Sequence, residues 1–258
     1  MEKISMFKKI ILTSAVLMAF ASPMALASEA ENKLVDVDFS FEGPLGTYDK
    51  AALQRGALVY RQVCSSCHSL KRVAYRNLTA LGYSEEQTKV IAAEYTVMDG
   101  PNDDGEMFER PARPSDKFVS PFANDKAAMA ANGGALPPDL SLITKARHGE
   151  AEYVYGILTG FSAAPEHVAV PEGKYYNKAM TGNVIAMAPP LSNGAVSYED
   201  GAPQTVEQYA KDVSTFLAWA AEPEMEQRKQ MGVKVLLFLA VFAVIMYGVK
   251  RKIWEKAH

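Results

Sequence analysis

The residues with the clearest chemistry are Cys64 and Cys67, which are the two cysteines of the chain, and His68, which follows them directly. Residues 64–68 read CSSCH, which is the C-x-x-C-H spacing of a covalent haem attachment site. Each thiol can add across one vinyl group on the same side of a porphyrin, and the adjacent imidazole can then reach the iron. The motif predicts one covalently bound haem c, held by Cys64 and Cys67, with His68 as an axial ligand.

Two other uses of this cysteine pair compete with haem. A thioredoxin-like redox pair requires a βαβ context, and no such pattern surrounds residues 64–68. A zinc half-site requires a second pair of ligands, for which the chain offers only His148, His167 and His258. Haem attachment is therefore the favoured interpretation.

The second axial ligand is less sharply indicated by the sequence. Electron-transfer cytochromes c pair the histidine with a methionine, which raises the reduction potential. Six methionines lie outside the two terminal apolar segments: Met98, Met107, Met129, Met180, Met187 and Met225. Met187 stands in the stretch IAMAPP, where the prolines favour an extended backbone that could hold a thioether in place. A methionine is also a common core filler, so Met187 is preferred, with Met180 and Met129 as alternatives.

Two helices are predicted to position the motif. The first begins near Asp49 and runs to Cys64, with Leu53, Ala57 and Tyr60 on one face. The second is expected over Val206–Ala221.

A capping box of Thr205 and Gln208 marks the start of the second helix. We expect the two helices to cross, with Gly56 and Tyr60 meeting Phe216, Leu217 or Trp219.

The rest of the chain is expected to be loops and shorter helices, because no alternating strand pattern of any length appears. Helices are predicted at Glu85–Tyr95, Leu140–Arg147 and Tyr153–Leu158. Irregular segments are predicted at Ser28–Gly46, Pro101–Pro121 and Ser162–Tyr175, where glycine, proline or polar residues dominate. The expected fold class is mostly α, a cytochrome c-type haem domain with long loops and one C-terminal transmembrane helix.

The chain begins with a segment typical of an export signal. Lys8 and Lys9 precede the apolar run 10–20, and small residues lead to a cleavage pattern ending at Ala27. Residues 1–27 are therefore predicted to be a signal peptide that is removed. A first transmembrane helix is the alternative, but it would need about 20 apolar residues.

The C-terminal region predicts a membrane anchor at residues 228–249. Its run 231–249 is apolar except for Lys234, which lies near one end and can extend toward the interface. The tail 250–258 opens with three basic residues, which the positive-inside rule places in the cytoplasm. The domain 28–227 would then lie outside the cytoplasm, which for a protein of a bacterial inner membrane is the periplasm. A buried core helix is the alternative.

The domain 28–227 is acidic, with 17 Lys and Arg against 28 Asp and Glu, so its net charge is −11. This balance argues against nucleic acid as a partner and favours a basic partner or simple solubility. Residues 99–109 hold five of the acids, and this loop is either a docking surface or only a solvated one.

Several segments in order along the chain resemble the cytochrome c1 family, the haem subunit of the cytochrome bc1 complex. Besides the haem motif they are residues 39–44 (FSFEGP), 134–141 (GALPPDLS), 146–149 (ARHG), 158–160 (LTG), 187–190 (MAPP) and 219–223 (WAAEP). The region 70–132 matches least well. Some relatives in this family carry a disulfide near the axial methionine, and this chain has no cysteines for it.

The resemblance implies roles for individual residues. Met187 matches the axial methionine of the family, and Arg147 matches an arginine that pairs with a haem propionate. Tyr153, Pro137 and Pro138 match residues that line the haem pocket.

It also implies an electron-transfer role with no bond-making active site in this chain. The haem would take electrons from the Rieske iron–sulfur protein and pass them to a soluble c-type cytochrome. Cytochrome b and membrane lipid would be its partners in the membrane. The alternatives are an anchored monohaem cytochrome of another respiratory complex, or a haem enzyme or gas sensor with an open sixth site.

Overall fold

A computed structural model of the protein describes residues 35–166 and 168–255. The predicted signal peptide 1–27 lies outside these residues and remains a prediction, and His167 and His258 also lie outside them. Everything below refers to the described part of the chain.

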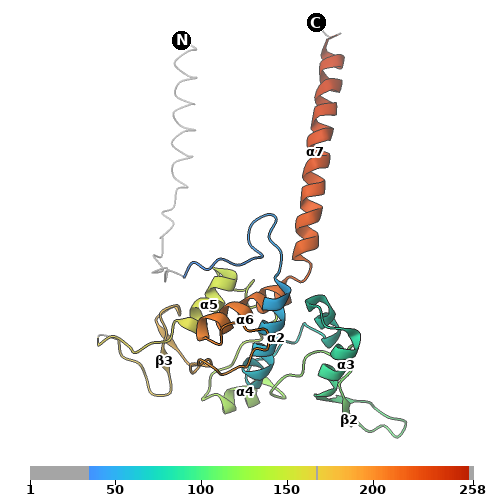
Figure 1. The fold of residues 1–258 in the computed structure, drawn as a ribbon. Coiled ribbons are helices and arrows are strands. Elements are labelled where there is room, and N and C mark those ends of the chain that lie inside the picture. Colours follow the sequence, from blue (N-terminus) through green and yellow to red (C-terminus); the bar gives the residue numbers. More distant parts are fainter. Residues whose placement is uncertain (1–34, 167, 256–258) are drawn as a thin grey trace, which may run out of the picture. The chain divides into compact units, whose positions relative to one another are not determined.

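The described chain is mostly helical, as the sequence predicts (Figure 1). The α-helices are α2 (Lys50–Gln62), α3 (Glu85–Ala93), α4 (Asp125–Ala131), α5 (Glu150–Thr159), α6 (Val206–Ala221) and α7 (Met225–Trp254). Two 3₁₀ segments accompany them, η1 (Cys64–Ser66) and η2 (Tyr75–Leu81).

Two small antiparallel strand pairs interrupt the loops. Strand β1 (Thr96–Asp99) pairs with β2 (Phe108–Pro111), so that Met98 lies opposite Glu109. Strand β3 (Tyr175–Tyr176) pairs with β4 (Val184–Ile185). The predicted loops 101–121 and 162–175 therefore contain strand residues, which the sequence missed because strands of two to four residues are too short for an alternating pattern.

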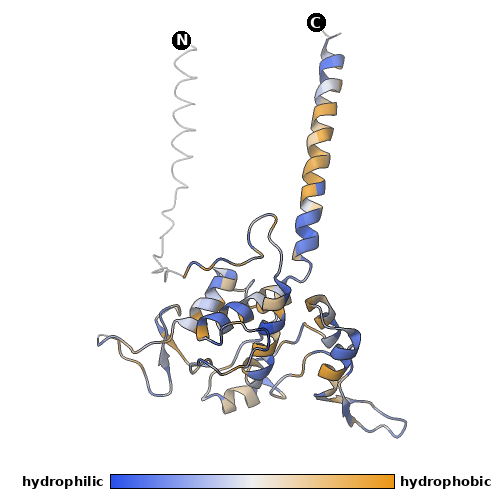
Figure 2. Ribbon diagram, in the orientation of Figure 1, coloured by the Kyte–Doolittle hydropathy of each residue, from blue (hydrophilic) through white to orange (hydrophobic). Residues whose placement is uncertain are grey.

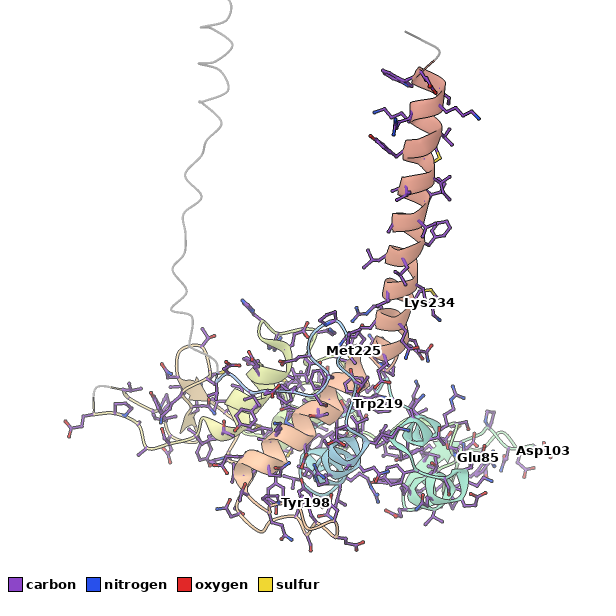
Figure 3. The ribbon with its side chains drawn as sticks, turned by 45° about the horizontal axis from the view of Figure 1, so that its top comes forward. Glu85, Asp103, Tyr198, Trp219, Met225 and Lys234 are labelled. Atoms are coloured by element: carbon purple, nitrogen blue, oxygen red, sulfur yellow. The ribbon has the colours of Figure 1, made fainter. Side chains whose placement is uncertain are left out.

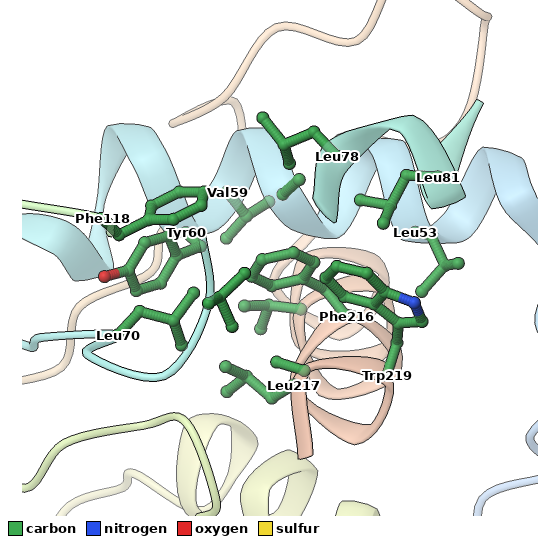
Figure 4. Close-up of a cluster of buried hydrophobic side chains, with 14 of the residues drawn as sticks. Leu53, Val59, Tyr60, Leu70, Leu78, Leu81, Phe118, Phe216, Leu217 and Trp219 are labelled. Atoms are coloured by element: carbon green, nitrogen blue, oxygen red, sulfur yellow. The ribbon is translucent and has the colours of Figure 1, made fainter. Parts of the chain in front are cut away.

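The core is built where α2 crosses α6, and this predicted crossing is confirmed. A Cβ atom added to Gly56 would stand 2.7 Å from the Cβ atom of Phe216, so glycine permits the close approach. The rings of Tyr60 and Phe216 lie 5.8 Å apart between centroids, and Trp219 stacks on Phe216. Figure 4 shows these rings among buried leucines, with Phe118 on the far side of Tyr60.

Side-chain caps start both core helices. The Asp49 carboxylate accepts the backbone N–H of Ala51 at the start of α2. The Thr205 hydroxyl accepts the backbone N–H of Gln208 at the start of α6. Such caps satisfy amide groups that have no partner within the helix.

The predicted helix at Leu140–Arg147 is wrong, because this segment forms turns. Its first amides bond elsewhere. Leu140 N–H donates to the Ser69 carbonyl at 2.9 Å, and Ser141 N–H donates to the Asp139 carboxylate at 3.0 Å. The helix α5 that follows is longer than the predicted Tyr153–Leu158, and α4 was not predicted at all.

Helix α7 has 30 residues and is long and apolar enough to cross a membrane. Figure 2 shows an apolar middle between hydrophilic ends, and Figure 3 labels Met225 and Lys234 on this helix. The helix begins before the predicted anchor 228–249.

The first turns of α7 contact the domain. Met225 is buried, and the Glu226 carboxylate accepts the backbone N–H of Tyr48 at 2.8 Å. Lys229 donates to the carbonyls of Phe41 and Gly46 at 2.6 and 3.1 Å. These turns therefore bind the segment 35–48 that precedes α2, here called the N-terminal arm, and they also begin the apolar helix.

Candidate haem site

The cysteine motif lies on a tight turn directly after α2. Helix α2 ends at Gln62, and the 3₁₀ segment η1 follows at Cys64. The Cys64 carbonyl accepts the backbone N–H groups of Cys67 and His68 at 3.1 and 2.9 Å. This turn keeps both thiols and the imidazole on one short stretch of backbone, and both thiols are free.

The Cys64 thiol does not resemble a redox-active thiolate. Burial, together with the neighbouring Cys67, raises the pKa of Cys64 to about 12. Reactive cysteines of C-x-x-C redox motifs instead have lowered pKa values. This environment speaks against the thioredoxin-like alternative.

The His68 ring is oriented by the main chain of Pro138. Its Nδ1 atom lies 2.8 Å from the Pro138 carbonyl oxygen, 70 residues away in the sequence. A carbonyl can only accept, so Nδ1 carries the proton and the neutral ring keeps its lone pair on Nε2. Burial lowers the pKa of His68 below its ordinary value, although the Pro138 carbonyl and Asp139 oppose this shift. A neutral imidazole with a free Nε2 is the form that binds metals.

Asp139, which was not among the predicted site residues, connects the segment after His68 to the segment that carries Pro138. Its carboxylate accepts hydrogen bonds from the Ser69 hydroxyl, the Lys71 amide and the Ser141 amide. Burial alone would raise the pKa of Asp139, but these bonds outweigh it and hold the pKa below its ordinary value. An acid placed directly after two prolines was the signal available in the sequence.

Met187 lies two residues after β4, in the segment that leads to Pro189, and its side chain is half-buried. A groove of about 360 Å³ lies beside this segment. Its lining residues are Phe161, Ser162, Tyr175, Tyr176 and Pro189. Three of the five lining residues are aromatic, and Pro189 follows Met187 by two positions.

The two alternative methionines are placed differently. Met129 lies on α4 with 41% of its surface exposed. The Sδ atom of Met180 accepts a hydrogen bond from the Tyr153 hydroxyl at 3.9 Å. Of the three, Met129 is the least protected from water, and the sulfur of Met180 is already engaged.

The predicted propionate partner Arg147 is exposed at the end of the turn segment. Its Nη1 donates to the Ala146 carbonyl at 3.0 Å, and its guanidinium lies 6.0 Å from the centroid of the Tyr153 ring. Within residues 35–166 and 168–255, no carboxylate pairs with Arg147. Pro137 is half-buried and Pro138 exposed.

The structure thus joins two pairs of the predicted site residues directly. A hydrogen bond joins His68 to Pro138, and a cation–ring contact joins Arg147 to Tyr153. Met187 makes no hydrogen bond to either pair. The described residues contain no group of three or more His, Cys, Asp or Glu side chains able to hold a metal ion.

This donor set fits haem. Two free thiols on one turn suit two thioether bonds, and an imidazole with Nε2 available suits the iron. The thioether of Met187 can complete a histidine–methionine pair, and the exposed guanidinium of Arg147 can bind a carboxylate through two hydrogen bonds.

Comparisons with known proteins agree with this geometry. A family model described as the cytochrome C1 family matches residues 39–257. The chain is 47% identical to cytochrome c1 of Rhodospirillum rubrum, with 90% of this chain and 91% of that protein covered. It is 49% identical to the mitochondrial cytochrome c1 heme protein of Arabidopsis thaliana, with coverages of 91% and 77%.

A third relative is the cytochrome b/c1 of Bradyrhizobium diazoefficiens, 50% identical over 91% of this chain. The chain spans only 37% of the length of that protein. The matches confirm the expected role, a haem-bearing electron-transfer subunit of the cytochrome bc1 complex, and do not favour a cytochrome of another respiratory complex, a haem enzyme or a gas sensor. This chain belongs to the cytochrome c1 family.

Proposed function

We propose that the chain carries a single haem c, attached through Cys64 and Cys67, with His68 and Met187 as the axial ligands. The haem iron would supply the one-electron couple, and the chain's own residues bind it, orient it and shield it from water. The observation that carries this proposal is the hydrogen bond from His68 Nδ1 to the Pro138 carbonyl, because it leaves Nε2 ready to bind iron.

Four further residues are assigned to the haem pocket. Arg147 neutralises a propionate, which is supported by its exposed guanidinium and by the lack of a carboxylate partner for it among the described residues. Tyr153 supports the guanidinium through its ring and donates to Met180. Pro137 and Pro138 form part of the pocket wall, and neither brings a backbone N–H that would need a partner.

Serine substitution of each cysteine tests covalent attachment. Cys64→Ser and Cys67→Ser are expected to abolish or sharply reduce the haem that stays on the chain in denaturing electrophoresis, measured by haem staining. Ser66→Ala is the matched control, since it changes the same turn but no thiol, and it should keep the stain. Undiminished staining in both serine variants would place the attachment site elsewhere.

The chain is proposed to work beside cytochrome b, to receive electrons from the Rieske iron–sulfur protein and to pass them to a soluble c-type cytochrome. Family membership supports this, and one relative is named cytochrome b/c1. Purification of the tagged full chain from detergent-solubilised membranes tests it. Cytochrome b and an iron–sulfur protein should co-purify. Recovery with the subunits of a terminal oxidase instead would refute this assignment.

The haem domain is proposed to face the periplasm of a bacterial inner membrane, with the tail 250–258 in the cytoplasm. The basic residues after the apolar part of α7 support this orientation. A green fluorescent protein fused after the C-terminus should fluoresce, and an alkaline phosphatase fused there should be inactive. The opposite pattern would reverse the orientation.

A further inference from the structure

We infer that Asp139 is a positioning residue for the haem ligand His68. Its carboxylate ties the chain after the haem motif to the segment that carries Pro138, and so it holds the Pro138 carbonyl against the His68 ring. The inference rests on the proposed function, because it takes His68 as the iron ligand.

The carboxylate bonds to both segments at once. Its Oδ2 atom accepts from the Ser69 hydroxyl at 2.8 Å and from the Lys71 amide at 2.9 Å. Its Oδ1 atom accepts from the Ser141 amide at 3.0 Å. Two of the three donors, Ser69 and Lys71, lie within three residues after His68, and the third belongs to the segment of Pro138. A single carboxylate therefore closes a link across about 70 residues of sequence.

Further bonds run parallel to this link. The Leu140 amide donates to the Ser69 carbonyl at 2.9 Å, and the Arg72 amide donates to the Ser141 hydroxyl at 3.0 Å. Ser69 is 8% exposed and Ser141 is fully buried. These bonds make residues 69–72 and 139–141 one connected unit beside the ring.

Pro138 depends on this unit for its position. Neither Pro137 nor Pro138 has a backbone N–H, so this part of the segment cannot donate a hydrogen bond to anchor itself. Pro138 is also exposed, so packing constrains it little. The first anchored residue next to the carbonyl is Asp139.

Only a carboxylate suits the three donors. It offers two acceptor oxygens and no proton, whereas an asparagine offers one oxygen and turns an N–H₂ group toward donors. Bonds to an ionised acceptor are also stronger than neutral ones. A partner that fixes the second nitrogen of a metal-bound imidazole sets its tautomer, orientation and basicity. Asp139 would act on the iron ligand through Pro138.

The strength of the hydrogen bond between His68 Nδ1 and the Pro138 carbonyl can be followed through the exchange rate of the Nδ1 proton with solvent. We would label the histidines of the detergent-solubilised full chain with ¹⁵N and follow the signal in the ferrous protein. Asp139→Asn is expected to speed the exchange by about tenfold or more, since charge-assisted bonds are lost. Ser69→Ala removes one bond at unchanged charge and should speed it by about threefold. If Asp139→Asn does not fold, Ser69→Ala still decides the question.

Asp212→Asn is the matched control, because it removes another buried carboxylate, in α6, and leaves the Asp139 bonds intact. It should lower the melting temperature without speeding exchange at His68. Equal acceleration by the control, or no acceleration in Ser69→Ala, would overturn the inference.

The reduction potential gives a second readout. A looser Nδ1 bond makes the imidazole a weaker donor, so Ser69→Ala should raise the potential at constant charge. Failure of the proposed function looks different. In that case the ¹⁵N signal of His68 would lack a paramagnetic shift in the ferric wild-type protein, whatever the Asp139 variants do.

Discussion

Gly56 of α2 lies so close to Asp212 of α6 that an added Cβ atom would stand 2.1 Å from the Asp212 carbonyl oxygen. Main-chain atoms on a packed helix cannot move aside as the end of a side chain can. Gly56→Ala is therefore expected to destabilise the domain by about 3 kcal/mol or more, at the upper end of overpacking costs. Thermal unfolding of the full chain measures the loss.

Gly232 of α7 provides the control for this substitution, because no atom of the described residues lies within 4 Å of its added Cβ atom, apart from its chain neighbours and the adjacent backbone of its own helix. Gly232→Ala should be neutral or slightly stabilising, as alanine favours helix. A melting temperature for Gly56→Ala equal to that of the wild type would contradict this prediction, because it would show that α2 and α6 can move apart without loss of stability.

Arg55 and Asp212 form a buried ion pair at the same crossing. Nε and Nη2 of Arg55 donate to the two carboxylate oxygens of Asp212 at 2.9 Å each, and the Asp212 side chain is 1% exposed. Arg55→Met should cost about 3–5 kcal/mol, because it leaves a buried charge unpaired. The double variant Arg55→Met with Asp212→Leu should be clearly milder, as a double-mutant cycle of unfolding free energies would show. A double variant as unstable as the single one would mean that this pair is not the source of the loss.

Met187→Leu is expected to keep the covalent haem and to lose its strong sixth ligand. The reduction potential should fall by at least about 0.1 V, a modest part of the roughly 0.8 V range that axial ligands cover. Carbon monoxide should now bind the ferrous protein, which an optical spectrum detects. Met180→Leu and Met129→Leu serve as controls and should leave both properties nearly unchanged. If one of the controls shows the effect instead, the ligand assignment moves to that residue.

Truncation after Gln230 should leave a soluble haem domain, whereas truncation after Glu224 should loosen its N-terminal arm. The longer product keeps the Glu226 bond to Tyr48 and the Lys229 bonds to the arm carbonyls, and the shorter one loses them. Limited proteolysis should cut the arm only in the shorter product. Both should have normal haem spectra. Equal resistance of the two arms would show that the arm is held without α7.

The exposed acids between β1 and β2 are expected to steer a basic soluble cytochrome. Asp103 and Asp104 are exposed, whereas Asp99 pairs with Arg110 and is left unchanged. Asp103→Asn with Asp104→Asn should slow bimolecular electron transfer at low salt and barely alter it at about 0.15 M salt, where the screening length is about 8 Å. Stopped-flow kinetics measure this.

An equal charge change elsewhere is the control for steering. Glu199 and Glu207 are both exposed, and Glu199→Gln with Glu207→Gln should have a smaller effect on the low-salt rate. If both double variants slow electron transfer equally, the effect depends only on the net charge of the domain. The loop between β1 and β2 would then be only a solvated surface.

The sequence by itself determined the features of this protein that depend on short stretches of chain. The CSSCH spacing indicated haem, the 3.6-residue periodicity indicated α2 and α6, and the capping residue Thr205 marked the start of α6 at Val206. The long apolar run indicated a helix able to cross a membrane. Each of these signals lies within one short stretch of chain, because helix formation and haem attachment depend on near neighbours.

What depended on distant segments was decided only by the tertiary structure. Leu140–Arg147 has the composition of a helix, yet its first amides bond to Ser69 and Asp139 and it folds as turns. The tautomer of His68 is set by a carbonyl 70 residues away. No periodicity or spacing encodes such a contact, because it forms only when packing around the α2–α6 crossing brings the two segments together and their polar groups must find partners away from water.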